Sequence, residues 1–234
     1  MTELSPGTFD KQLQGFADKV GHLLSACLPG APDMEVTELG NRAGVRPRGQ
    51  TERRGGAPLM VAGETLAWLR LNYRCRLDTT ATYLAIDASK IWVVAEVDRT
   101  PIFRFEYLYE AESVPHSHIH VHGERGVLSH LLSKTGHAVP HDMSALHLPT
   151  GGSRFRPDLE DVIQFLLEEC KFDAVAGWRE RVHAARAEWR ATQVRAATRA
   201  MAAEAAAELR RIGYTVTPPE DGHPEAGARA RYAW

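Results

Sequence analysis

The chain has 234 residues, of which 44% are apolar and 25% are charged, and its formal net charge is −2. This length suits one domain, or one domain with an appendage, and the composition excludes a disordered, collagen-like or disulfide-scaffold chain. The longest apolar run is far shorter than the roughly 20 residues that a membrane helix needs, so we expect no membrane partner. The net charge gives no overall attraction to nucleic acid.

The N-terminus and the cysteines favour a cytoplasmic protein. The first residues lack a basic region followed by an apolar stretch, so no secretory signal is predicted. Cys27, Cys75 and Cys170 are odd in number and widely spaced, without a C-x-x-C pair. This spacing argues against a disulfide framework and against a structural zinc site, and it indicates a reducing compartment.

The first quarter of the chain divides into a helix and a linker. Residues 1–28 are predicted to hold an N-terminal helix, because apolar side chains recur every three or four positions until Pro29-Gly30. Residues 29–64 carry repeated Pro and Gly together with five arginines and show little strand alternation. We expect a basic Pro/Gly-rich linker on the surface, or alternatively an arm that contacts phosphates or a partner.

The core is predicted between residues 65 and 174. Apolar and polar residues alternate in five runs, at 66–77, 80–87, 90–98, 101–109 and 117–123. The breaks between the first four runs are each two residues long, which allows only hairpin connections. Helices fit residues 125–134 and 157–171, with a short extended piece at 143–149. The predicted fold class is α+β, a five-stranded antiparallel meander with the C-terminal helical region on one face.

The C-terminal part is predicted to contain one long helix at 175–212, which is rich in Ala, Arg and Glu and nearly free of helix breakers. Its apolar stripe would pack on the sheet or on a second subunit, so we expect a homodimer or another protein partner through this helix. Its eight arginines alternatively form a phosphate-binding face. The tail 213–234 is rich in Gly, Pro and Ala and is expected to be loosely held.

Histidine is concentrated in one part of the chain, since eight of the 11 histidines lie between positions 116 and 147. His118, His120 and His122 alternate along one predicted strand, so their rings share a face. In the preceding strand, Arg104 and Glu106 share a face in the same way. If the two strands pair, Arg104 and Glu106 flank the histidine row.

These residues suit three uses. Two imidazoles can divide acid and base work at neutral pH, with Arg104 stabilising phosphate charge and Glu106 orienting a ring, which suits cofactor-free cleavage of a phosphate ester. Alternatively, the row binds Zn²⁺ or Mn²⁺ through His118 and His120, with a third ligand from His122, His147 or Glu106. The row can also be solvated, or bind metal without catalysis. The leading hypothesis needs no cofactor and names the ligands, if a metal is used, as His118, His120 and His122.

A second candidate site is the turn at residues 147–156. His147 precedes a Pro- and Gly-rich turn, and Arg154 and Arg156 follow it. Exposed backbone N–H groups beside two guanidinium groups can hold a phosphate. We therefore predict that His147, Arg154 and Arg156 bind substrate phosphate together with Arg104. The chain has no G-x-x-x-x-G-K-[ST] motif, which excludes a P-loop.

Two resemblances bear on the activity. The five residues His118-Ile119-His120-Val121-His122 resemble the His-φ-His-φ-His core of the histidine-triad (HIT) nucleotide hydrolases and transferases. That resemblance implies that His120 attacks an α-phosphate, supported by His118 and His122. The segment Arg104-Phe105-Glu106-Tyr107, followed by Pro115-His116-Ser117-His118, is similar to an arrangement in small toxin ribonucleases of bacterial toxin–antitoxin pairs.

The functional hypothesis is therefore a histidine-based hydrolase or transferase acting on a phosphate ester of RNA or of a nucleotide. The alternative is a non-catalytic metal-binding or interaction protein that dimerises through residues 175–212.

Overall fold

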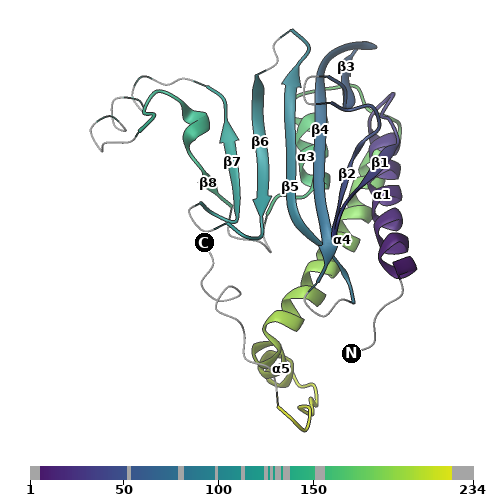
Figure 1. The fold of residues 1–234 in the computed structure, drawn as a ribbon, viewed down its shortest axis with the longest axis vertical. Coiled ribbons are helices and arrows are strands. Elements are labelled where there is room, and N and C mark those ends of the chain that lie inside the picture. The colour runs from purple at the N-terminus through teal and green to yellow at the C-terminus, as the bar shows by residue number, and fades with distance from the viewer. Residues whose placement is uncertain are drawn as a thin grey trace.

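In the described part of the chain, eight strands form one antiparallel sheet, and helices cover one of its faces (Figure 1). The computed structural model describes residues 6–222, apart from 52–53, 79–81, 98–99, 112–113, 124–125, 127–128, 130–132, 134–137 and 151–155. The α+β class is confirmed. The predicted five-stranded meander is instead four strands, within residues 64–121, and these are part of a larger sheet.

The strands follow the order β1-β2-β4-β5-β6-β7-β8, and β3 pairs with β4 beside this path. They span Met34–Leu39 (β1), Arg42–Pro47 (β2), Ala57–Val61 (β3), Glu64–Leu77 (β4), Leu84–Ala95 (β5), Pro101–Leu108 (β6), Ser117–Val121 (β7) and Leu148–Pro149 (β8). The order of β4 to β7 follows the chain order, as the short predicted connections require.

Strand β5 replaces two predicted strands. The runs 80–87 and 90–98 belong to one strand, because the break expected at Ala88-Ser89 is not a turn. The register shifts there instead: Arg74 pairs with Ala88 and Cys75 pairs with Ile86, which leaves Asp87 as an extra residue. Such a β-bulge interrupts the period-two pattern that the sequence prediction relied on.

Residues 29–64 were predicted to be a linker, and this prediction is wrong. They contain β1, β2 and β3, and β1 and β2 form a hairpin in which Leu39 pairs with Arg42. Gly40 in the turn has φ +68°, a conformation that glycine adopts without strain. The strands are short and punctuated by glycine and proline, which is why their alternation is weak.

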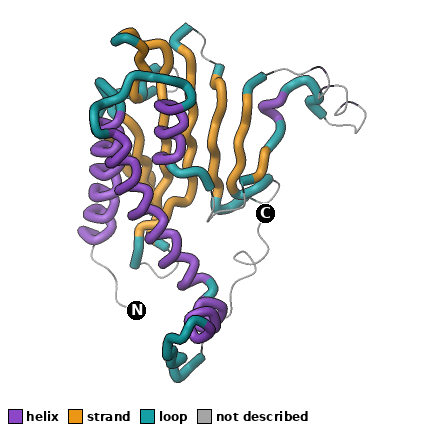
Figure 2. Tube along the Cα trace, turned by 180° about the vertical axis from the view of Figure 1, so that it is seen from behind, coloured by secondary structure: helices purple, strands orange, loops and turns teal. Residues whose placement is uncertain are grey.

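Three helices lie on the same side of the sheet: α1 (Pro6–Cys27), α3 (Leu159–Glu168) and α4 (Trp178–Ala200) (Figure 2). The N-terminal helix and the helix predicted within 157–171 are thus present. Helix α3 begins with a capping box, in which Asp158 accepts from the Asp161 backbone N–H and the Asp161 side chain reaches back. No helix among the described residues is both long enough and apolar enough to cross a membrane.

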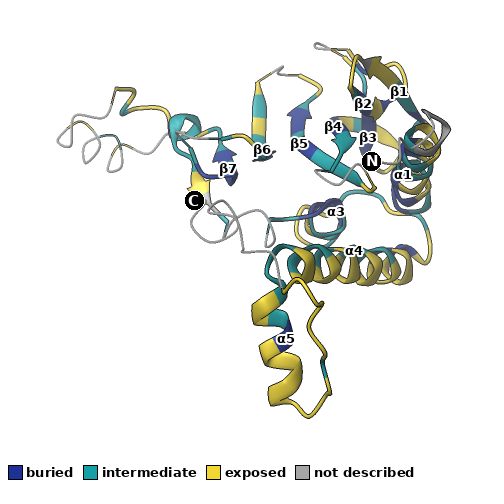
Figure 3. Ribbon diagram, turned by 60° about the horizontal axis from the view of Figure 1, so that its bottom comes forward, coloured by how far each residue is buried: buried dark blue, intermediate teal, exposed yellow. Residues whose placement is uncertain are grey.

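The long helix predicted at 175–212 is two helices. Helix α4 ends at Ala200, because the backbone of Met201 leaves the helical region (φ −135°, ψ 56°), and α5 (Ala202–Arg211) continues in a new direction. Trp178 and Val182 of α4 are buried, and α4 packs on α1 and α3. The first residues of the predicted apolar stripe are therefore buried against helices of the same chain. Helix α5 extends away from the sheet and is mostly exposed (Figure 3).

The two faces of the sheet differ in chemistry. The helix-covered face carries apolar side chains that pack with the helices, including Leu69 and Leu71 of β4, Ile91 and Val93 of β5, and Leu24, Ile163 and Leu166 of the helices. The opposite face, called the open face below, has no described helix over it (Figures 1 and 2). Alternation places polar side chains on that face, and it positions the candidate site.

Candidate metal centre on the open face of the sheet

The pairing of β6 with β7 brings the predicted residues together. Arg104 lies opposite His120, and Glu106 lies opposite His118. The intervening Phe105 is partly buried and packs against the core on the helix side. Arg104 and Glu106 therefore flank the histidine row on the open face, as the sequence predicted.

Three histidines form a compact cluster. One ring nitrogen each of His118, His120 and His147 lies within 4.8 Å of the others. The ring centroids are 4.6 to 4.9 Å apart. His147 reaches the cluster because the next two residues form β8, in which Leu148 pairs with Ile119 of β7. Among the described residues, this is the group that could hold a metal ion.

Two backbone carbonyls fix the orientation of the first two rings. The Nδ1 of His118 lies 2.7 Å from the Pro115 carbonyl oxygen, and the Nδ1 of His120 contacts the Ser144 carbonyl oxygen. A carbonyl oxygen can only accept, so each Nδ1 carries the hydrogen. In a neutral ring the Nε2 then presents a lone pair, which is the arrangement that metal-binding histidines usually have.

Glu106 lies beside two of the three rings. Its Oε2 lies 3.5 Å from the Nε2 of His118 and 3.6 Å from the Nε2 of His120. Its Oε1 lies 3.5 Å from the Nζ of Lys90 and 3.7 Å from the Nε of Arg104. Burial raises the pKa of Glu106, but the contact with His118 and the charges of Arg104 and Lys90 outweigh burial and lower the pKa to about 2. The carboxylate is therefore ionised at neutral pH.

The rings of His120 and His147 favour the neutral form. Burial lowers the pKa of His120, and it lowers the pKa of His147 with a further contribution from His118. Neutral imidazole is the form that binds metals. The centre thus offers three imidazole nitrogens within 4.8 Å of one another, and one carboxylate oxygen that lies 3.5 and 3.6 Å from two of the rings.

Comparison of the chain with protein-family models, with curated proteins and with solved structures found no match. The metal preference of the centre is therefore inferred from its ligand atoms alone. Imidazole and carboxylate ligands suit Zn²⁺ and also Mn²⁺, whereas Ca²⁺ and Mg²⁺ prefer oxygen ligands alone.

The remaining predicted site residues lie elsewhere. His122 was predicted as a ligand, but it is outside the three-histidine group, and its Nε2 is buried with no hydrogen-bond partner in the described structure. Arg156 was predicted to bind phosphate, but its guanidinium stacks 4.1 Å from the Tyr107 ring and 4.8 Å from the Trp189 ring of α4. Tyr107 has the opposite strand parity from Glu106, so Arg156 is on the helix-covered face. Arg154 lies outside the described residues.

A cavity of about 290 Å³ adjoins the centre on the open face. Glu106 lines it, and so do the side chains or backbone of Gly44, Asn72, Tyr73, Arg74, Ala88, Ser89, Lys90 and Leu108. The sequence prediction missed its two cations, Arg74 and Lys90. The alternation of arginines at positions 70, 74 and 76 of one strand was a signal that could have indicated a basic face.

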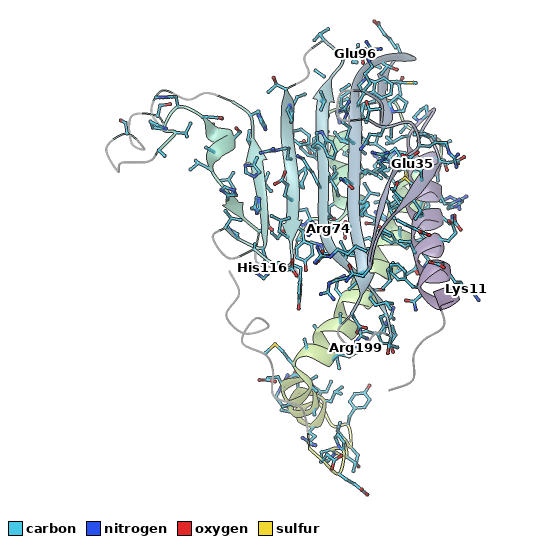
Figure 4. The ribbon with its side chains drawn as sticks, in the orientation of Figure 1. Lys11, Glu35, Arg74, Glu96, His116 and Arg199 are labelled. Atoms are coloured by element: carbon cyan, nitrogen blue, oxygen red, sulfur yellow. The ribbon has the colours of Figure 1, made fainter. Side chains whose placement is uncertain are left out.

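Asp87, the bulge residue of β5, organises the basic side of this cavity. Its carboxylate is fully buried, and it lies 2.7 Å from the Nε of Arg74, 3.3 Å from the Nε of Arg42 and 3.4 Å from the Nε of Arg76. In Figure 4, Arg74 lies toward the lower end of the sheet, the end at which His116 precedes β7. One buried carboxylate thus holds three guanidinium groups on the open face.

Proposed function

We propose that this protein is a metal-dependent hydrolase of phosphate esters in RNA or nucleotides, with Zn²⁺ or Mn²⁺ bound by His118, His120, His147 and Glu106. The observation that carries the proposal is the convergence of three ring nitrogens within 4.8 Å of one another beside an ionised carboxylate. The cavity next to Glu106, with Arg74 and Lys90 in its lining, supports an anionic substrate.

The geometry supports a metal over cofactor-free chemistry. The side chains of His118 and His120 are 1% and 5% exposed, so neither ring is open to a substrate as the nucleophile of a HIT-like enzyme must be. Both Nδ1 atoms face carbonyl oxygens, so a proton on either Nε2 would make that ring a cation. A divalent ion satisfies all four donors at once without placing imidazolium ions side by side.

The bound ion would supply a water of lowered pKa that acts as the nucleophile. In hydrolysis, the oxygen of a water molecule would form a bond to phosphorus, the ester P–O bond would break, and the proton lost by the water would end on the leaving oxygen. Lys90 and Arg104 hold the Oε1 of Glu106, and their charge favours a phosphate near the centre.

Metal content and hydrolysis should be measured on the same preparations. The protein is stripped with EDTA, reloaded with Zn²⁺ or Mn²⁺, and assayed on an RNA oligonucleotide and on a nucleotide panel. We expect about one bound ion per chain, and hydrolysis that EDTA abolishes and the metal restores. His147→Ala should weaken metal binding by at least about 100-fold.

Two control variants sharpen the test. His141 lies in the same segment as His147 but is exposed and outside the cluster, so His141→Ala should bind metal normally. His122→Ala distinguishes the observed ligand set from the one predicted from sequence, and it should also keep the metal. Hydrolysis that survives EDTA and His147→Ala would overturn the metal mechanism, and metal binding with no hydrolysis of any substrate would leave a non-catalytic metal protein.

A further inference from the structure

We infer that the cavity beside Glu106 is a subsite for a neighbouring phosphate of a single RNA strand, bound by Arg74 and Lys90. This inference rests on the proposed function, because it assigns the substrate class to the same centre. The substrate would then be a polynucleotide whose cleaved phosphate lies at the metal and whose next phosphate lies in the cavity.

The strand register places the cavity in line with the centre. Asn72, Lys90, Glu106 and His118 lie opposite one another on four successive strands, β4 to β7. Arg74 is two residues along β4 from Asn72 and is therefore on the same face. By strand spacing and rise, the backbone of Arg74 is two strands and two residues from that of Glu106, on the order of 10 Å. A single phosphate at the metal does not span this distance, whereas a strand with successive phosphates does.

Arg74 is the guanidinium that remains available to a ligand. Arg42 also contacts Glu110, and Arg76 donates to the Leu77 carbonyl oxygen and stacks on the Tyr109 ring. Arg74 donates through its Nε to Asp87, and its two terminal nitrogens have no hydrogen-bond partner among the described residues. Its side chain is 38% exposed. A guanidinium held at Nε and free at its end can bind a phosphate with two parallel hydrogen bonds.

The neighbouring residues favour RNA over another polyanion. Trp92 lies on the open face opposite Arg104 of β6, and its ring is 5.1 Å from the Nζ of Lys90. An aromatic ring beside phosphate-binding cations can stack an unpaired base, which is how proteins usually recognise single-stranded RNA. An acidic peptide would use the cations but not the indole.

The test is a binding titration with zinc-loaded protein and a fluorescein-labelled single-stranded RNA whose linkages are phosphorothioates, which resist hydrolysis. Anisotropy is recorded over a range of salt concentrations for wild type, Arg74→Gln and Arg46→Gln. Arg46 is the matched control, because it is on the open face but pairs with Glu35 and does not line the cavity. Zinc content and melting temperature are measured for each protein.

Arg74→Gln should raise the dissociation constant about 10-fold and lower the salt slope by about one counterion at unchanged zinc content. Loss of the hydrogen bond from Arg74 to Asp87 should lower the melting temperature by a few degrees, so binding is measured well below the unfolding transition. Arg46→Gln should stay within about twofold of wild type. Trp92→Leu should weaken RNA binding without changing the salt slope, since stacking releases no counterions.

Equal affinity and slope for Arg74→Gln and wild type would overturn the inference. Equal binding of a poly-glutamate peptide of the same charge would overturn the assignment to RNA. Failure of the proposed function has a different signature, namely a wild-type protein that takes up no zinc or cleaves no substrate. In either case, the comparison of Arg74→Gln with Arg46→Gln decides whether the cavity binds RNA phosphate.

Discussion

The Asp87 carboxylate should be one of the most sensitive polar positions of the sheet. It is fully buried, and three guanidinium groups converge on its two oxygens. Asp87→Asn keeps the size of the side chain but removes the charge and places an N–H donor against other donors. The three arginines then repel one another without a counterion, and the β-bulge loses the interaction that orients it.

The expected loss of unfolding free energy follows from the contacts of Asp87. Two of them, from the Nε of Arg74 at 2.7 Å and from the Nε of Arg76 at 3.4 Å, are hydrogen bonds to a charged acceptor. Each such bond contributes about 1.5 to 3 kcal/mol. The arginine side chains are 20% to 38% exposed, so water compensates part of the loss. We expect the free energy of unfolding to fall by about 2 to 4 kcal/mol, which lowers the melting temperature by about 5 to 10 °C for a chain of this size.

Urea denaturation monitored by circular dichroism, together with calorimetry, measures both quantities. The matched control is Glu35→Gln, which removes the carboxylate of an ion pair on the same face whose two side chains are 28% and 45% exposed. An exposed pair contributes at most about 1 kcal/mol, so the control should change little. If Asp87→Asn unfolds within about 1 kcal/mol of wild type, the three-arginine network does not stabilise the fold as argued.

Three other variants test separate parts of the structure. Burial and the charge of Asp158 raise the pKa of Glu160 to about 7. The contribution of the protonated Glu160 side chain to stability is therefore present at acid pH and is lost as the pH rises through 7. Between pH 5 and pH 8, the unfolding free energy of Glu160→Gln relative to wild type should increase by about 1 to 2 kcal/mol, measured by urea denaturation. Gly56 has φ +125°, and an added Cβ would lie 2.5 Å from the Leu69 carbonyl oxygen, so Gly56→Ala should cost more than about 2 kcal/mol. Gly49→Ala is its control, since the added Cβ there has no neighbour within 4 Å, and it should cost about 1 kcal/mol for its φ of +74° alone. Glu106→Gln should raise the zinc dissociation constant at least about 10-fold in a chelator competition, and an unchanged constant would remove Glu106 from the ligand set.

Local alternation was enough to predict the central part of the site. The period-two patterns around Glu106 and His118 gave the face of each side chain, and the register fulfils the condition that the two strands pair. The two strands follow one another in the chain, joined by residues 109–116, and consecutive antiparallel strands usually lie side by side. The fold class followed in the same way from the hairpin spacings of the meander.

The third histidine of the cluster could not be selected by the same means. His147 reaches the cluster through a two-residue strand, β8, which is too short to show a pattern. The sequence left His122, His147 and Glu106 as alternatives for the third ligand, and the alternation favoured His122 because it continues the row. β7 ends at Val121, one residue before His122, which is why the row does not extend to it.

Asp87, the buried acid of β5, shows a different limit of prediction from sequence. A β-bulge shifts the side-chain alternation by one residue, so period-two analysis placed a strand break where Asp87 enters the open face. The three arginines that surround Asp87 come from β2 and β4, and β2 belongs to a segment with too little pattern to predict. The basic side of the cavity thus depends on the pairing of strands that are not adjacent in sequence, which local patterns do not show.

The burial of the histidines is the strongest argument that the centre has a ligand. Counted with their backbone, His118 and His120 are 2% and 4% exposed, although they are on the face opposite the apolar core. With both Nδ1 atoms on carbonyl oxygens, their Nε2 atoms meet the Oε2 of Glu106, which is also an acceptor. Neutral rings would leave both Nε2 lone pairs facing an acceptor, and one protonated ring would still leave one such pair. Two protonated rings would put two cations with ring centroids 4.9 Å apart in a buried site, which is also costly. A divalent cation among these atoms removes both penalties, so the stripped protein should be less stable than the zinc-loaded protein.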